Sequence, residues 1–345
     1  MGETYEGAGV SIGAGDAAVD AIKAAVRSTY RPEVLGDIGG FGGMFRFDPT
    51  RYADPVLVSS TDGVGTKANV ATAVGRFDTI GLDLVAMSVD DLVCTGAEPL
   101  FFLDYISVGQ LDPDHARQLV AGVAEGCRQA GCALVGGEMA EHPGMMQPGE
   151  FDLVGFAVGV VERSRMITGE HVSAGDVLIG LPSPGLRSNG YSLARRLMFD
   201  VAGRSVTDPA WDAPDAPSTG DELLVPSVIY APAIRSLVDA VEVHSIAHIT
   251  GGGLPGNLNR VLGERSDAMV DPGSWEWPRL FTELQRIGDV ELDEMRKVFN
   301  LGIGMVVVVP PEAFDAAIAD LAASGHRARR IGEVVAGSGV VRFAD

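Results

Sequence analysis

One helix-length segment limits how this chain can fold more than any other stretch. Residues 78–95 are almost uniformly apolar, which is typical of a helix buried between layers. Asp83 and the pair Asp90 and Asp91 interrupt it, and the helical period places them about two turns apart on one face. An unpaired carboxylate in the interior is costly, so we expect a metal ion or a basic partner at this face. A surface position for the face is the alternative.

A short strand followed by a glycine-bearing loop is the second informative feature. Residues 55–59 are apolar and β-branched and predict a strand, and residues 60–67 read Ser-Thr-Asp-Gly-Val-Gly-Thr-Lys. The two glycines permit positive φ, so backbone N–H groups can turn towards an anion. Asp62 and Lys67 add opposite charges, and Mg²⁺ commonly joins one or two carboxylates to phosphate oxygens. The loop therefore indicates nucleotide chemistry, with an exposed turn capped by Asp62 as the alternative.

A third acidic position repeats this strand-to-loop pattern. Residues 133–135 predict a strand that runs into Gly136, Gly137 and Glu138, where the glycines admit close approach of the backbone. Asp62, Asp91 and Glu138 each stand at an element that the pattern places in the interior. We therefore predict that these three carboxylates form one metal site.

The N-terminal part contains a glycine-rich segment and two basic residues on a predicted helix. Residues 36–43 lack the lysine and the serine or threonine of a Walker A loop, so this segment is either a cover over phosphates or a linker. Lys23 and Arg27 lie on one face of a helix predicted from residue 17 to residue 28. They could reach a phosphate, although two such residues are commonly just solvated.

The chain divides into two blocks of alternating strands and helices, which predicts an α/β fold in two domains. Residues 163–176 form a polar connection, so we place the domains at residues 1–168 and 169–345. In the second block, residues 188–190 and 250–252 bring hydroxyl, amide and glycine groups to predicted helix N-termini. Such places bind anions.

Charge and cysteine content exclude several classes of function. The formal net charge is -21, whereas binding to nucleic acid or to an anionic membrane would need a clustered basic face. The three cysteines are too few and too unpatterned for a disulfide framework or a zinc site. The N-terminal residues lack the basic and apolar regions of a signal peptide, so we expect a soluble, cytoplasmic protein.

Taken in order, these segments resemble the phosphoribosylformylglycinamidine cyclo-ligase (aminoimidazole ribonucleotide synthetase) family over nearly the whole chain. The resemblance lies in residues 8–10, 14–15, 31–34, 39–42, 61–67, 96–105, 136–138, 188–193 and 248–254. It implies an ATP-dependent ring closure in purine synthesis. In that family ATP phosphorylates the formamide oxygen of formylglycinamidine ribonucleotide, a nitrogen of the same molecule attacks the carbon, and phosphate leaves.

The resemblance also implies cofactors, an assembly and roles for single residues. We expect ATP with Mg²⁺, a ribonucleotide substrate, and a homodimer in which the N-terminal domains join strands into a β-barrel-like interface, while the C-terminal domain is a mixed sheet covered by helices. Asp62, Asp91 and Glu138 are the expected metal ligands and, with Arg187, the expected catalytic residues. Expected ATP contacts are Lys23, Gly39, Gly40, Gly42, Thr61, Gly63, Gly65, Thr66 and Lys67, and expected substrate contacts are Ser188, Asn189, Gly190, Thr250, Gly251 and Gly252.

Arg187, Asp90, Asp221 and Gly256 depart from the family pattern, and the first two bear on the expected site. Arg187 stands where histidine is common, and an arginine serves as an oxyanion or phosphate clamp rather than as a proton shuttle. Asp90 stands where asparagine is usual and adds charge beside the expected metal site. The alternative to a cyclo-ligase is therefore a divergent paralogue, either another ATP-dependent synthetase or kinase or a non-catalytic nucleotide-binding protein.

Overall fold

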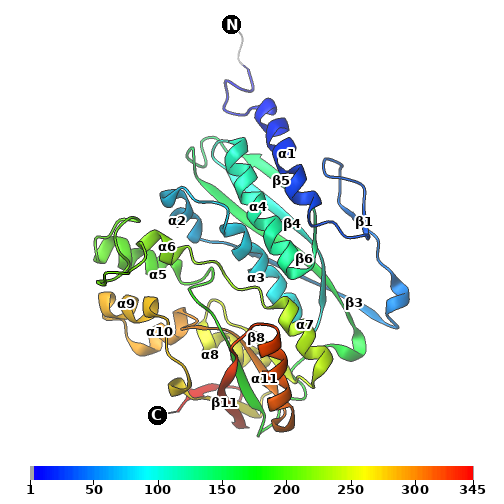
Figure 1. Cartoon of the computed structure of the whole chain (residues 1–345), viewed down its shortest axis with the longest axis vertical. Helices are drawn as coiled ribbons and strands as arrows, with labels where there is room; N and C mark the ends of the chain where they lie inside the picture. Colours follow the sequence, from blue (N-terminus) through cyan, green and yellow to red (C-terminus); the bar gives the residue numbers. More distant parts are fainter. Residues whose placement is uncertain (1–3, 345) are drawn as a thin grey trace.

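The computed structural model describes residues 4–344, which build one main sheet in each half of the chain and a small two-stranded sheet in the N-terminal half (Figure 1). In the N-terminal half the elements are α1 (Ile12–Arg27), β1 (Val34–Leu35), β2 (Met44–Phe45), β3 (Pro55–Gly63), α2 (Lys67–Val74), α3 (Ile80–Cys94), β4 (Glu98–Val108), α4 (Pro113–Ala130), β5 (Ala133–Glu141) and β6 (Phe151–Glu162). Strands β3, β6, β4 and β5 form a four-stranded sheet in that order, in which only the pair β4 and β5 is parallel.

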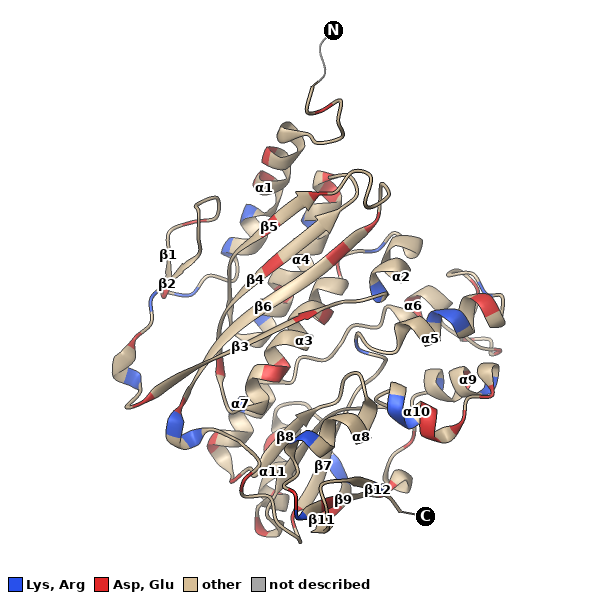
Figure 2. Cartoon of the chain, turned by 180° about the vertical axis from the view of Figure 1, so that it is seen from behind, with Lys and Arg blue, Asp and Glu red and all other residues tan. Residues whose placement is uncertain are grey.

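Helices α3 and α4 cover one face of this sheet, and α1 packs on α4 (Figure 1). The predicted burial of the helix over residues 78–95 is confirmed, because α3 is buried along nearly its whole length. Strand β6 alternates buried and exposed residues, as expected for a sheet with only one face covered. The other face carries the exposed side chains of Leu57, Tyr105, Val154 and Phe156, and the view in Figure 2 shows no helix over it.

The C-terminal half forms a six-stranded, mostly antiparallel sheet. Its elements are β7 (Val177–Pro182), α5 (Tyr191–Arg195), a π-helical turn (Arg196–Val201), α6 (Thr219–Leu223), α7 (Ala231–Ala240), β8 (Ser245–His248), α8 (Gly253–Leu258), β9 (Ser266–Val270), α9 (Arg279–Gly288), α10 (Leu292–Val298), β10 (Ile303–Val309), α11 (Phe314–Ala323), β11 (Arg329–Ala336) and β12 (Val341–Phe343). The strand order is β12, β9, β11, β7, β10 and β8. The last strand, β12, pairs in parallel with β9.

The two halves meet along α3. This helix contacts α7 and β8 of the C-terminal half as well as β3, β4 and β6 of its own sheet. Because α3 is enclosed from both sides, its three carboxylates lie at the junction between the halves, and their partners come from both. This junction positions the candidate site.

Candidate active site

The first carboxylate of α3, Asp83, forms a fully buried ion pair with Lys67. The Lys67 Nζ lies 2.7 Å from Asp83 Oδ2, and neither side chain is exposed to solvent. Asp83 also accepts hydrogen bonds from the backbone N–H (2.8 Å) and the hydroxyl (2.6 Å) of Ser227. Lys67 donates in addition to the carbonyl oxygens of Val225 (2.9 Å) and Arg187 (3.2 Å). Lys67, predicted to contact ATP phosphates, has its ammonium in the interior, where it joins the two halves.

The second carboxylate, Asp90, pairs with Arg187. An Arg187 guanidinium nitrogen lies 2.9 Å from Asp90 Oδ2, and both side chains are fully buried. The other Asp90 oxygen accepts hydrogen bonds from the N–H groups of Tyr230 (2.9 Å) and Ala231 (3.1 Å), which begin α7. Negative charge at a helix N-terminus is favourable, so Asp90 is compensated from two sides. A basic partner, rather than a metal ion, explains the burial of Asp83 and Asp90.

His248, at the end of β8, connects this ion pair to the third carboxylate. The Arg187 nitrogen that binds Asp90 also lies 2.7 Å from His248 Nε2, and His248 Nδ1 lies 2.8 Å from Asp91 Oδ1. Arginine can only donate and a carboxylate can only accept, so Nε2 is the acceptor and Nδ1 carries the proton. His248 was not among the predicted site residues. The signal available in the sequence was its place at a strand end directly before the predicted anion-binding turn.

Asp91 and Asp62 form an acidic pair at the edge of this network. The Asp91 side chain is 48% exposed and also accepts a hydrogen bond from the Ser60 hydroxyl (3.2 Å). Burial opposes ionisation of Asp91, but the hydrogen bonds from His248 and Ser60 outweigh it and hold the pKa of Asp91 below its usual range. For Asp62, burial raises the pKa, and the negative charge of Asp91 raises it further. Two neighbouring carboxylates, of which one opposes the ionisation of the other, are a donor set suited to a divalent cation.

The predicted substrate residues lie in two turns that face each other near this pair. A Cβ added to Gly251 would lie 3.6 Å from the Asn189 side-chain nitrogen, and one added to Gly65 would lie 3.8 Å from the Ser188 carbonyl oxygen. The turns of residues 188–190 and 250–252 and the loop of residues 63–66 thus lie next to one another. The Ser188 Oγ and the Asn189 Oδ1 are buried without a hydrogen-bond partner among the described residues. These two atoms are available to a ligand.

Glu138 does not join the other two predicted metal ligands. Asp62 pairs with Gly155 and points to the face covered by α3, whereas Glu138 pairs with Tyr105, whose side chain lies on the uncovered face. Strands β3 and β5 also form opposite edges of the sheet. Among residues 4–344, no group of three or more His, Cys, Asp or Glu side chains is placed to hold a metal ion. The predicted three-carboxylate site is therefore not formed within one chain.

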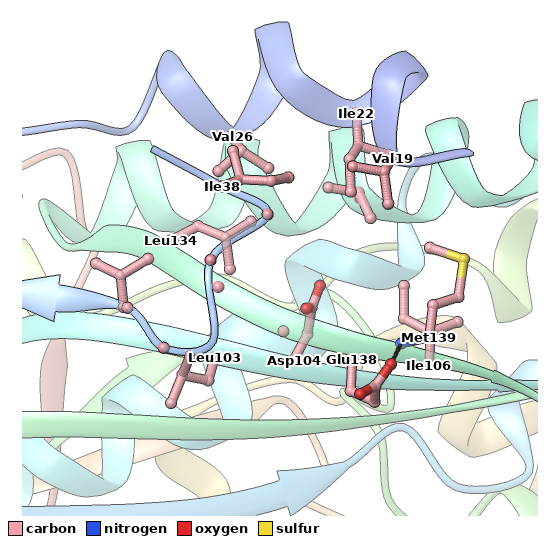
Figure 3. Close-up of a pocket in the computed structure, with 18 of the residues that line it drawn as sticks. Val19, Ile22, Val26, Ile38, Leu103, Asp104, Ile106, Leu134, Glu138 and Met139 are labelled. Carbon is pink, nitrogen blue, oxygen red and sulfur yellow. Dashed lines mark hydrogen bonds between the residues drawn. The ribbon is translucent and has the colours of Figure 1, made fainter. Parts of the chain in front are cut away.

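The glycine-rich segment covers a cavity instead. Gly39, Gly40 and Gly42 line a pocket of about 600 Å³ between α1 and the β5 edge of the sheet. Figure 3 shows Val19, Ile22 and Val26 of α1 on one side of it and Asp104 rising from the sheet on the other, while Glu138 points the opposite way. Burial raises the pKa of Asp104 to about 7.

Comparisons with known proteins identify the family. Residues 48–161 match the family described as AIR synthase related protein, N-terminal domain, and residues 173–345 match its C-terminal domain. A phosphoribosylformylglycinamidine cyclo-ligase of Trichlorobacter lovleyi is 52% identical over 332 residues, covering 96% of this chain and 94% of the relative. Another, from an Anaeromyxobacter species, is 52% identical and covers 98% of both chains. The chain belongs to the phosphoribosylformylglycinamidine cyclo-ligase family.

Solved structures with lower sequence identity share the fold of this cyclo-ligase family member. A thiamine-monophosphate kinase from Stenotrophomonas maltophilia has a TM-score of 0.70 at 21% identity, covering 95% of both chains. The hydrogenase maturation protein HypE in complex with ATP has a TM-score of 0.66 at 20% identity, covering 92% of this chain and 88% of that one. In the part of the chain that the structure describes, no helix has the length and apolar character needed to cross a membrane.

The structure places four further predicted site residues as follows. Lys23 forms an ion pair with Asp20 of the same helix, with 2.5 Å between Lys23 Nζ and Asp20 Oδ1, and does not line the cavity. The Thr61 hydroxyl donates to the Gly155 carbonyl oxygen (2.8 Å), and Thr66 is the residue before α2. Arg187, predicted as a catalytic residue that clamps an oxyanion or a phosphate, is 1% exposed and has its guanidinium in the Asp90 pair. The sequence alone does not reveal the contacts of Thr61 and Arg187, because their partners Gly155 and Asp90 lie far away in the chain, whereas Lys23 and Asp20 are neighbours on one helix.

Proposed function

We propose that this chain catalyses the ATP-dependent cyclisation of formylglycinamidine ribonucleotide to aminoimidazole ribonucleotide, with release of ADP and phosphate. The observation that carries the proposal is the match to cyclo-ligases at 52% identity over 98% of both chains. The site supports it, because an acidic pair and two turns with free polar atoms meet at the junction of the two halves. The reaction needs such a meeting point for a triphosphate and a second anionic substrate.

In this reaction the formamide oxygen takes the terminal phosphoryl group of ATP, the neighbouring nitrogen attacks the same carbon, and phosphate leaves with that oxygen. Asp62 and Asp91 would hold Mg²⁺, which neutralises phosphate charge when bound. The Asn189 and Ser188 side chains would bind polar groups of the ribonucleotide, supported by their unpaired buried oxygens. Gly190 and residues 250–252 would let the substrate approach the backbone closely. Arg187 would act from behind this surface rather than on the substrate.

We further propose that Gly39, Gly40 and Gly42 cover part of ATP, supported by the cavity of about 600 Å³ that they line. This cavity lies at the β5 edge, whereas Asp62 lies on β3. A homodimer would resolve the separation. If the uncovered sheet faces of two subunits close into a barrel with a two-fold axis along it, the β3 edge of one subunit lies beside the β5 edge of the other. Glu138, on the face that closes into the barrel, would then lie in the dimer interface.

The remaining assignments follow from the same proposal. The division into domains 1–168 and 169–345 is supported by the two sheets, which end at Glu162 and begin again at Val177. We place the enzyme in the cytoplasm, where ATP and ribonucleotide intermediates are available. The partners in this proposal are the small-molecule substrates and a second copy of the chain.

The test is ADP release by the purified protein with Mg²⁺-ATP, with and without formylglycinamidine ribonucleotide. We expect ADP and aminoimidazole ribonucleotide in equal amounts only when the substrate is present, and loss of at least about 100-fold of this activity in Asp62→Asn. Asp293→Asn, at a fully solvated position, is the matched control and should keep full activity. ATP binding without substrate-dependent ADP release would instead identify a non-catalytic paralogue.

A further inference from the structure

Arg187 is held in the interior by contacts to both its backbone and its side chain. It is a non-glycine residue with φ of 62°, a conformation that costs free energy and persists only where surrounding contacts enforce it. Lys67 binds its carbonyl oxygen, the Val228 carbonyl oxygen accepts from its guanidinium (3.0 Å), and the Tyr230 ring lies 5.0 Å from its Cζ. The Asp90 carboxylate compensates the charge of the guanidinium. The guanidinium is therefore a fixed donor in the interior.

The group that this fixed donor serves is His248. One guanidinium nitrogen is shared between Asp90 and His248 Nε2, so the ion pair sets both the position and the proton arrangement of the imidazole ring. The opposite ring nitrogen then donates to Asp91 (2.8 Å). Asp91 is the only member of this chain of contacts with large exposure to solvent, at 48%. The series Asp90, Arg187, His248, Asp91 thus leads from a buried ion pair to an exposed carboxylate.

We propose that His248 is a positioning residue, anchored by the Arg187–Asp90 ion pair, that holds the Asp91 carboxylate beside Asp62 in the orientation that binds a divalent cation. This inference rests on the proposed function for the cation itself. It assigns a role to Arg187 and Asp90, two of the residues that depart from the family pattern. Arg187 and Asp90 act as one unit, in which each compensates the other's charge, and the unit serves His248. Such outer contacts orient ligands and tune metal affinity.

The first experiment reads the His248 ring directly, without nucleotide or metal. In protein labelled with ¹⁵N-histidine, the signals of His248 are assigned by their loss in His248→Gln. We expect Nδ1 to show the shift of a protonated nitrogen and Nε2 that of an unprotonated one. A protonated Nε2 would overturn the anchoring by Arg187, because two donors would then face each other. This readout is independent of the reaction, so a wrong proposed function leaves it intact.

The second experiment separates positioning from stability. Arg187→Met leaves the Asp90 carboxylate buried without a compensating charge, and Asp90→Asn leaves the Arg187 guanidinium buried without one. Both single variants should therefore have a lower melting temperature than the wild type. The double variant Arg187→Met/Asp90→Asn removes both charges, so its melting temperature should lie above that of either single variant. If Arg187→Met alone does not fold, the double variant and Asp90→Asn still provide the comparison.

Binding of the ATP analogue AMPPNP, titrated with Mg²⁺ and with EDTA, then gives the gain in affinity that Mg²⁺ provides. We expect this gain to fall about 10- to 100-fold in the double variant and in His248→Gln, and KM for Mg²⁺ to change more than kcat. His248→Asn places an amide N–H near the position of Nδ1, so this variant should lose less of the Mg²⁺-dependent gain in affinity than His248→Gln. A double variant with the full wild-type gain would show that the ion pair is purely structural and overturn the proposal. If wild-type protein shows no Mg²⁺-dependent binding, the role of Asp91 and the proposed function fail together, while the ring signals still decide the anchoring.

Discussion

Asp104 illustrates how the surroundings of a single carboxyl group change its chemistry. It lies among apolar residues in the cavity below the glycine-rich segment, and its Oδ2 has no hydrogen-bond partner among the described residues. Gly137 leaves room for it, since a Cβ there would lie 1.8 Å from Asp104 Oδ1. Burial raises the pKa of Asp104 to about 7, although a hydrogen bond from its own backbone N–H partly opposes the shift. The group therefore changes charge near neutral pH.

This shift predicts a pH-dependent loss of stability. The pKa rises from 3.8 in the unfolded chain to about 7 in the fold, so the unfolded state releases its proton first, and the stabilisation present at low pH is lost as pH rises towards 7. Asp104→Asn cannot ionise. Between pH 5.5 and pH 8, the free energy of unfolding of the wild type should therefore fall by about 2 kcal/mol relative to the variant. Urea denaturation at the two pH values measures this, with Asp293→Asn as the solvated control; parallel curves for wild type and Asp104→Asn would contradict it.

At the scale of elements, α3 is the helix on which both halves pack, and its neighbour α4 approaches it through glycines. A Cβ added to Gly81 would lie 2.1 Å from the Val123 nitrogen, and one added to Gly122 would lie 2.4 Å from the Asp78 carbonyl oxygen. Real Cβ atoms do not approach backbone atoms so closely, so the two helix backbones touch where these glycines cross. The crossing fixes the height of α3 above the sheet and hence the positions of its carboxylates.

Gly122→Ala should therefore destabilise the protein although alanine favours a helix. The added methyl group forces α3 and α4 apart, and overpacking of this kind costs about 1–3 kcal/mol, more than the roughly 1 kcal/mol that alanine gains over glycine in a helix. Gly13→Ala is the matched control, since a Cβ at this position of α1 meets nothing within 4 Å. Thermal unfolding should show a lower midpoint for Gly122→Ala and an unchanged or higher one for Gly13→Ala. Equal midpoints for the two variants would refute the close crossing.

These elements also show how far the sequence alone leads. The apolar run over residues 78–95 predicts a buried helix, and α3 extends from Ile80 to Cys94. The same run shows that its aspartates need partners, but Lys67, Arg187 and His248 come from a different helix, a turn and a strand. Local periodicity carries no information on such pairings. For the same reason, Glu138 could be recognised as a carboxylate after a strand, but the face to which it points depends on the register of β5 with β4.

At the scale of the whole molecule, the uncovered face of the first sheet is the feature that a single chain leaves unexplained. Leu57 (65% exposed), Phe156 (41%), Tyr105 (39%) and Val154 (39%) project from neighbouring strands on it. A row of large apolar side chains on adjacent strands is uncommon on monomers and typical of an interface. The overall charge of -21 would keep copies apart unless such a surface drew them together.

We expect the wild-type protein to be a dimer and Phe156→Glu to be a monomer. The substitution places a carboxylate at the centre of the apolar face, where dimerisation would bury it without a partner, at a cost of several kcal/mol. Because the side chain is exposed within one chain, the monomer itself should keep its fold and melting behaviour. Leu292→Glu on α10, at 42% exposure, is the matched control and should stay dimeric. Light scattering coupled to size-exclusion chromatography measures the mass; a wild-type monomer, or a Phe156→Glu dimer, would show that this face is not the interface and that the nucleotide site is completed within one chain.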